Sequence, residues 1–265
     1  MTFSAAGRDG PISQTVVLRV CDDSNACATS SATVNITNVA PTATFNAPAS
    51  VNEATPINVS LTSPLDPSSA DSGAGFTYAF DCGSGYGAFS SNNSASCATT
   101  DDGSRTVKGK VRDKDGGETE YTASVTILNV APSAAITGAP AASPEGILID
   151  LASTVTDPAG ANDPIAYSWS VTKNGTSFTT ALAAAFSFTS DDNGTYVVTL
   201  TVTDGDGGTG SDSKTIGVTN VAPTVSINDA PATGEVGQAI SLTSSVSDAG
   251  SDTFTYSWTV TRSGT

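Results

Sequence analysis

The stretch that decides the fold is Thr-Tyr-Val-Val-Thr-Leu-Thr-Val-Thr, residues 195–203. It places Tyr196, Val198, Leu200 and Val202 on one face, and threonine dominates the other. This alternation with a period of two is typical of an antiparallel strand with one face in a core and one in water. Gly, Pro, Ser, Thr, Asp and Asn punctuate the rest of the chain, and long apolar patterns at helical spacing are missing. The sequence therefore predicts an all-β fold.

The strand recurs because the whole chain is repetitive. The tetrapeptide Asn-Val-Ala-Pro begins at Asn38, Asn129 and Asn220, at two equal intervals of 91 residues. The strand that ends at Asp204 has counterparts that end at Asp22 and Asp113, each 16 residues before the tetrapeptide. Fixed self-similarity at this length indicates a tandem array, and one unit has the size of an immunoglobulin-like sandwich, about 100 residues. We expect tandem immunoglobulin-like antiparallel β-sandwiches joined by short linkers that proline stiffens.

The period also sets the domain organisation. Residues 39–129 and 130–220 make two complete repeats, whereas 1–38 correspond to the C-terminal half of a repeat and 221–265 to the N-terminal half. Neither half can cover its own apolar face, so we expect completion head-to-tail. Two sources of the missing halves remain open: neighbouring copies of this chain, or the rest of a longer array of which this chain is a window.

Several motifs of the repeat 130–220 together resemble a PKD domain. They are Glu145-Gly146 before a strand, Asp157-Pro158 after it, Tyr167-Ser168-Trp169, the run from Gly194 to Asp204, and Gly207-Gly208. The resemblance covers the whole unit, although the family's Trp-Asp-Phe-Gly-Asp-Gly run is reduced here to Trp169-Ser170-Val171-Thr172. It implies an immunoglobulin-like sandwich, found in tandem in cell-surface proteins and beside the catalytic domains of secreted hydrolases.

The charge balance narrows the function classes. The chain has 10 basic and 26 acidic residues, no histidine and a net charge of −16. Such a surface repels nucleic acids and anionic membranes, and no apolar run of 18 residues exists to insert into a bilayer. Without histidine the usual catalytic triads and most zinc sites are missing, and the acids recur with the repeat instead of forming one unique pair. We expect no enzyme.

The four cysteines fall into two local groups. Cys21 and Cys27 flank a predicted hairpin, while Cys82 and Cys97 align with Val171 and Phe188, which are expected core positions. Of the three possible connectivities the repeat alignment favours the two local disulfides, and the alternative is a metal site or free thiols. Disulfides indicate an extracellular or cell-surface protein. The first residues lack a secretory signal, so we expect a processed or partial piece of a longer exported protein.

Calcium is the one cofactor for which the sequence makes a case. Hard cations bind clustered oxygen ligands, and acids recur before a strand, in the loop after it and in the hairpin. The alternative is that these acids cap turns on solvated loops. In the last half-repeat the corresponding acids are Glu235, Asp248 and Asp252. In the complete repeats the candidate ligands are Glu53, Asp66, Asp71, Asp113, Asp115, Glu145, Asp157, Asp163, Asp204 and Asp206.

Aromatic residues mark the middle of each unit, at Tyr78-Ala79-Phe80, Tyr167-Ser168-Trp169 and Tyr256-Ser257-Trp258. We interpret them as core residues between two sheets, against the alternative of a carbohydrate-stacking platform. The resulting hypothesis is a non-catalytic structural repeat of an extracellular rod or filament. The alternative is an adhesion or polysaccharide-binding accessory module of a secreted enzyme, with a carbohydrate or cell-surface ligand that the sequence does not specify.

Overall fold

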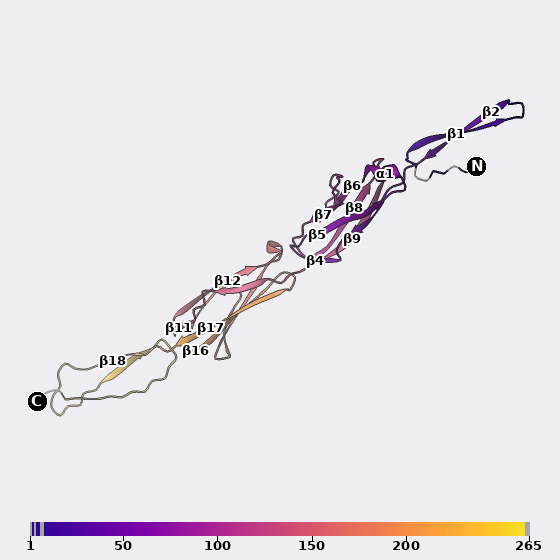
Figure 1. Cartoon of the computed structure of the whole chain (residues 1–265). Helices are drawn as coiled ribbons and strands as arrows, with labels where there is room; N and C mark the ends of the chain where they lie inside the picture. Colours follow the sequence, from indigo (N-terminus) through magenta and orange to yellow (C-terminus); the bar gives the residue numbers. More distant parts are fainter. Residues whose placement is uncertain (1, 3, 6–7, 263–265) are drawn as a thin grey trace. The chain divides into compact units, whose positions relative to one another are not determined.

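The computed structural model describes residues 2, 4–5 and 8–262. The chain divides into two compact units, Met1–Val130 and Ala131–Thr265, and the boundary lies inside the second Asn-Val-Ala-Pro tetrapeptide. Each unit joins one half-repeat to one complete repeat (Figure 1). No helix among the described residues is long and apolar enough to cross a membrane.

The first complete repeat is a sandwich of two sheets, ordered β3-β5-β7 and β4-β9-β8-β6. A short helix, α1 (Ser69–Ala74), begins at the cap residue Ser68 and lies in the loop after β5. The strands are β3 (Thr42–Asn46), β4 (Ser50–Asn52), β5 (Ile57–Leu65), β6 (Thr77–Asp81), β7 (Ser94–Cys97), β8 (Gly103–Arg112) and β9 (Glu118–Leu128).

The second complete repeat has the same plan, with sheets ordered β10-β12-β15 and β11-β17-β16-β13-β14. A single 3-10 turn, Gly160–Asn162, takes the place of α1. The strands are β10 (Ser133–Thr137), β11 (Ala142–Pro144), β12 (Leu148–Thr156), β13 (Ala166–Lys173), β14 (Thr176–Ala181), β15 (Ala185–Thr189), β16 (Gly194–Thr203) and β17 (Thr209–Thr219).

The structure confirms the predicted all-β antiparallel sandwiches, and each complete repeat adds one parallel pair of strands. Most neighbouring strands are antiparallel, but β4 runs parallel to β9 and β11 runs parallel to β17. The first strand of each repeat divides near Pro48 or Pro140, so its second part crosses to the other sheet. There it lies beside the last strand of the repeat, which runs in the same direction.

The alternating residues of β16 fill the core of the second repeat. Tyr196, Val198, Leu200 and Val202 are completely buried, together with Trp169 on the neighbouring strand β13. The Trp169 indole Nε1 donates a hydrogen bond of 2.8 Å to the Ala183 carbonyl oxygen, so the ring is buried without an unsatisfied donor. In the complete repeats the central aromatic strand therefore contributes to the core, and Trp169 is unavailable as a stacking platform.

The half-repeats expose the same positions. At the N-terminal end, β1 (Ile12–Cys21) and β2 (Cys27–Ile36) form an isolated hairpin, and at the C-terminal end β18 (Thr224–Asn228) pairs only with β19 (Thr243–Ser247). No strand is assigned at Tyr256-Ser257-Trp258, where the sequence predicts one. The equivalent strand β13 pairs with β14 and β16, and no counterpart of either strand is found among residues 221–262.

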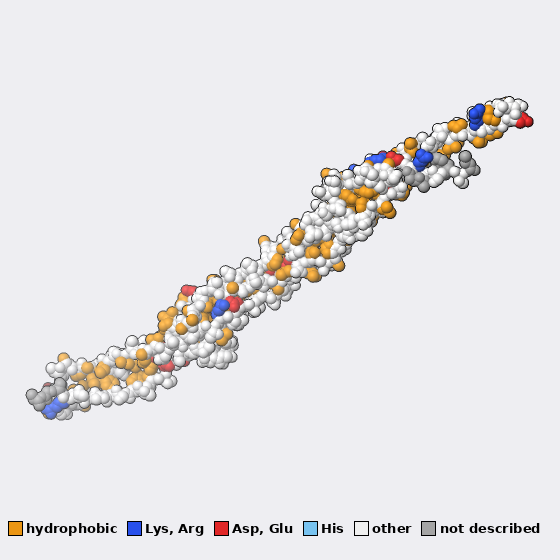
Figure 2. All heavy atoms as spheres, in the orientation of Figure 1, with side chains coloured by type: hydrophobic (Ala, Val, Ile, Leu, Met, Phe, Trp, Pro, Cys, Tyr) orange, Lys and Arg blue, Asp and Glu red, His pale blue; other side chains and the backbone are white. Residues whose placement is uncertain are grey.

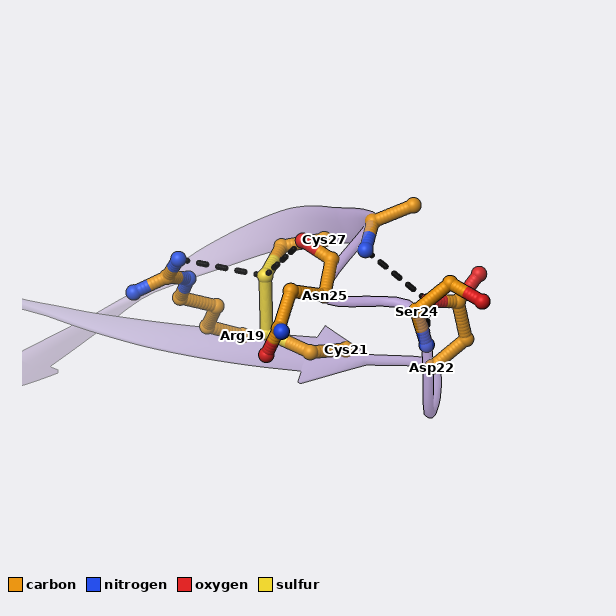
Figure 3. Close-up of a disulfide and its surroundings, with 7 residues drawn as sticks. Arg19, Cys21, Asp22, Ser24, Asn25 and Cys27 are labelled. Atoms are coloured by element: carbon orange, nitrogen blue, oxygen red, sulfur yellow. Dashed lines mark hydrogen bonds between the residues drawn. A yellow bond between two sulfur atoms is a disulfide. The ribbon is translucent and has the colours of Figure 1, made fainter.

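The structure contains both local disulfides that the repeat alignment favours. Cys21 and Cys27 face each other across the last pair of the β1–β2 hairpin (Figure 3). Cys82 follows β6 and bonds to the buried Cys97 of β7, which belongs to the opposite sheet. The second bond thus joins the two sheets of the first complete repeat, whereas the second complete repeat has no cysteine.

Candidate metal centres at the repeat junctions

The hairpin aspartates first serve the turns in which they lie. Asp113 Oδ1 accepts hydrogen bonds from the backbone N–H groups of Asp115 and Gly117, at 2.9 and 2.8 Å. Asp204 Oδ1 accepts from Asp206 and Gly208 at 3.0 and 2.7 Å. This is the turn-capping role that the sequence left open as an alternative to calcium. It occupies one carboxylate oxygen and leaves the other for a second contact.

The loop aspartates at positions 66, 157 and 248 also use one carboxylate oxygen to cap a turn. In each, Oδ1 accepts a backbone N–H two residues later, at 2.7 Å for Asp66, 2.9 Å for Asp157 and 3.3 Å for Asp248. In each, Oδ2 is buried and has no hydrogen-bond partner among the described residues. An uncompensated buried carboxylate oxygen is costly, and three repeats place one at the same position.

The acid before the long strand of each repeat reaches the start of the next repeat. Glu53 Oε1 accepts the Val130 N–H at 2.9 Å, and Glu145 Oε1 accepts the Val221 N–H at 2.7 Å. Both glutamates are buried. Gly250 is required opposite Glu145, because a Cβ there would lie 2.7 Å from the carboxyl carbon. The glutamate therefore fixes the geometry between its own repeat and the residues that follow.

In the first unit, Asp66, Asp71 and Asp113 form a buried cluster. One carboxylate oxygen from each lies within 4.8 Å of the others. The amide of Asn38, the first residue of the tetrapeptide, donates to Asp113 Oδ2 at 2.8 Å. Asp71 is fully buried, and its Oδ2 has no hydrogen-bond partner among the described residues. Burial raises the pKa of the Asp71 carboxyl above its ordinary value.

One ammonium group offsets part of this charge. Lys114 Nζ lies 2.9 Å from Asp9 Oδ2, 2.6 Å from Asp115 Oδ2 and 3.4 Å from Asp71 Oδ1. Hydrogen bonds to Asp115 and Asp9 raise the pKa of the Lys114 ammonium, so it stays charged. It faces Oδ1 of Asp71 and leaves Oδ2 without a partner. The cluster has more carboxylates than cations.

In the second unit, Glu145, Asp192 and Asp252 come together, again with one oxygen from each within 4.8 Å of the others. Glu145 Oε2 is buried and without a hydrogen-bond partner among the described residues. Burial first, and then the charges of Asp192, Glu145 and Asp248, raise the pKa of the Asp252 carboxyl. Lys173 lies beside this group, with its Nζ 3.6 Å from Asp192 Oδ2 and 2.8 Å from Asp191 Oδ1.

Within each compact unit, the structure brings together part of the predicted ligand set. Asp66, Asp71 and Asp113 form one cluster, Asp115 lies beside Asp71 and Asp9, and Glu145 belongs to the other cluster. Glu53, Asp163 and Asp204 are buried, and Asp157 is half-buried. Asp206 is an exposed turn residue. Its backbone N–H donates a hydrogen bond to Asp204 Oδ1, and its own carboxylate lies in solvent.

Sequence reasoning missed Asp9 and Asp192. Asp192 lies in the turn before β16, and Asp101 occupies the same position one period earlier. The 91-residue interval could therefore have found it. Asp9 has no counterpart in a complete repeat with the same contacts, and nothing in the sequence connects it with Lys114.

The comparisons with known proteins agree with this architecture. Residues 148–218, most of the second complete repeat, match the family model described as K319L-like, PKD domain. Over this stretch the chain is similar to a PKD domain. The matched residues lie in the sandwich of the second complete repeat, which has Trp169 in its core. No curated protein matches the chain.

Solved structures of modular β proteins are also similar at low identity. Fibronectin(III)-like modules of Clostridium thermocellum CbhA are 14% identical, with 66% of this chain and 94% of that chain covered and a TM-score of 0.28. Three N-terminal domains of the Hoc outer capsid protein of bacteriophage RB49 are 19% identical, covering 79% and 68%, with a TM-score of 0.28. The amphioxus IgVJ-C2 molecule is 14% identical, covering 64% and 99%, with a TM-score of 0.35.

Proposed function

We propose that this chain is a non-catalytic structural segment of an extracellular rod or filament, in which complementary half-repeats complete one another. The match of residues 148–218 to a PKD family model and the two disulfides support an extracellular setting. The acids of the repeat serve turns and junctions, and none of them forms a unique catalytic constellation with a nucleophile among the described residues. A spacing or adhesive role requires only stable sandwiches in series.

The observation that carries the proposal is the exposure of core positions in the half-repeats. Leu18 of β1 is 63% exposed, whereas Leu200, its counterpart in β16, is fully buried. Ile227 of β18 is 63% exposed, while its counterpart Ile136 belongs to the core of the second repeat. Figure 2 shows the apolar side chains at the surface of the C-terminal half-repeat. Large exposed apolar surfaces on extracellular modules indicate contact surfaces.

In the second repeat the equivalent faces cover each other. There, β10 and β12 lie in one sheet and β16 and β17 in the other, and their side chains share one core. The C-terminal half-repeat holds the counterparts of β10 and β12, and the N-terminal half-repeat holds those of β16 and β17. The occupant that fits each exposed face is therefore the other half-repeat of a neighbouring molecule. Such a contact is heterologous and repeats without closing.

Two adjacent residues of β1 give a matched test. Leu18 and Val17 are 63% and 62% exposed, but they point to opposite faces, and the counterpart of Val17 is Thr199 on the solvated side of β16. We expect the chain to associate with rising concentration into chains of molecules, seen by light scattering and electron microscopy. Leu18→Asp should abolish this association, while Val17→Asp should leave it intact.

Monomers at every concentration, or equal effects of the two variants, would contradict the proposal. The intact mass of native material then separates the two sources of the missing halves. A species near 26.3 kDa indicates subunits that complete one another, and a far larger chain indicates a covalent array. The two cases share the same contact between half-repeats.

A further inference from the structure

We infer that two acidic clusters, each built on at least one buried carboxylate, are calcium sites that lock each half-repeat to the complete repeat beside it. The first consists of Asp66, Asp71 and Asp113, and the second of Glu145, Asp192 and Asp252 with Asp248 next to them. The inference concerns metal binding inside each unit, so it stands whether or not half-repeats assemble head-to-tail.

The two oxygens of each carboxylate have different surroundings. One oxygen of Asp66, Asp113, Glu145 and Asp248 is held by backbone N–H groups, which fixes the side chain before any ion arrives. The other oxygen of Asp66, Glu145 and Asp248 is buried and has no hydrogen-bond partner among the described residues. Asp71, fully buried, adds another such oxygen to the first cluster. A cation satisfies these oxygens simultaneously.

The spacing of the carboxylate oxygens and the net negative charge of the clusters both fit a calcium ion. Oxygens on opposite sides of a calcium ion, with bonds of about 2.3–2.6 Å, lie up to about 5 Å apart. In both clusters the oxygens lie within 4.8 Å of one another, so a calcium ion can contact all of them. Hard oxygen ligands without nitrogen or sulfur favour calcium over zinc or copper. Lys114 and Lys173 contact the margins of the clusters and offset only part of the charge.

The residues at each cluster come from both the complete repeat and the half-repeat. In the second cluster, Glu145 and Asp192 belong to the complete repeat, whereas Asp248 and Asp252 belong to the half-repeat that follows. In the first, the Asn38 amide from the end of the half-repeat donates to Asp113 of the complete repeat. An ion in the second cluster would therefore connect two repeats directly, and an ion in the first would hold the aspartate to which Asn38 is hydrogen-bonded. This position predicts that calcium stiffens the junction and leaves each sandwich core unchanged.

The test is calorimetric titration of calcium chloride into the chelator-treated 265-residue chain. Asp71→Asn should remove one equivalent of binding and Glu145→Gln another, because each replaces a central charged ligand. Asp23→Asn and Glu120→Gln are the matched controls, since both side chains are exposed and outside the clusters. Their binding should equal that of the parent chain. No binding to the parent, or unchanged binding in both cluster variants, overturns the assignment.

Thermal unfolding midpoints, measured in chelator and in calcium, test the same inference if a variant folds poorly. In chelator, Asp71→Asn and Glu145→Gln should unfold at or above the midpoint of the parent, because each removes an uncompensated buried charge. In calcium the order should reverse, since only the parent gains the ion. A merely structural role predicts that both variants are less stable than the parent under both conditions, and that outcome would refute the inference.

Discussion

At the scale of the residue, the two tryptophans occupy one position of the repeat in opposite surroundings. Trp169 is fully buried and its indole nitrogen is hydrogen-bonded, whereas Trp258 is 50% exposed. The side chain is the same, so the difference between them comes from the strands that cover Trp169. They form an internal comparison of a completed and an uncompleted sandwich.

We expect Trp169→Ala to destabilise the second repeat by about 3–5 kcal/mol, because it leaves a large cavity in the core. Trp258→Ala should change the stability of the dispersed chain by no more than about 0.5 kcal/mol. Chemical denaturation followed by circular dichroism measures both. If Trp258→Ala proved as harmful as Trp169→Ala in dispersed chains, the exposed surroundings described for Trp258 would be wrong.

At the scale of the element, β17 depends on glycine at one point, where it approaches the linker. A Cβ on Gly210 would overlap the carbonyl oxygen of Pro132, the last residue of the tetrapeptide. Gly217 lies on the same strand, and a Cβ there would meet the Ala141 carbonyl oxygen at 3.8 Å, an ordinary contact. The close approach at Gly210 fixes the linker against the strand.

Gly210→Ala should therefore destabilise the second unit by at least about 1 kcal/mol, because backbone atoms must shift to admit the methyl group. Gly217→Ala, the matched control, should be neutral or slightly stabilising, since alanine restricts the unfolded chain more than glycine does. Thermal unfolding of the two variants under the same conditions gives the comparison. Equal midpoints would show that the strand and the linker are not in the contact described.

The sequence predicted the all-β fold and both disulfides, and each feature that it did not predict has a physical reason. Alternation in residues 195–203 predicted β16 and its buried face, and the 91-residue interval favoured both disulfide pairs. The parallel strand β11 was missed because three residues are too few to show a pattern. The central aromatic strand of the last half-repeat was predicted but is not formed, since pairing depends on a partner strand and not on the segment alone. Asp9 was missed because its contact with Lys114 is long-range.

At the scale of the whole molecule, the two complete repeats share a plan but differ in covalent reinforcement. Cys82–Cys97 joins the sheets of the first across a sequence separation of 15 residues, and the second has no cysteine. A bond that closes a loop of this length stabilises a fold by about 3 kcal/mol, mainly by restricting the unfolded chain. The repeats should therefore respond differently to a reductant.

We expect reduction to lower the stability of the first complete repeat by about 2–4 kcal/mol and to leave the second unchanged. In a Trp258→Phe background, Trp169 is the only tryptophan and its fluorescence reports the second repeat alone. Hydrogen exchange at Val107 and Val125, both in the core of the first repeat, reports the other. A matching fall in both reporters would mean that the repeats do not unfold separately.

The parallel pair of β11 and β17 has a mechanical consequence. The two strands lie near opposite ends of the repeat in sequence, and their register joins Ala142 to Gly217 and Pro144 to Thr219. A force that pulls the repeat by its ends acts along these strands, across their hydrogen bonds, including Gly217 N–H to Ala141 O and Glu145 N–H to Thr219 O. Bonds loaded in shear must break together, whereas a hairpin pulled open at one end loses them one at a time. The three residues of β11 thus make the second sandwich resistant to tension along its length, and β4, which runs parallel to β9, has the same role in the first.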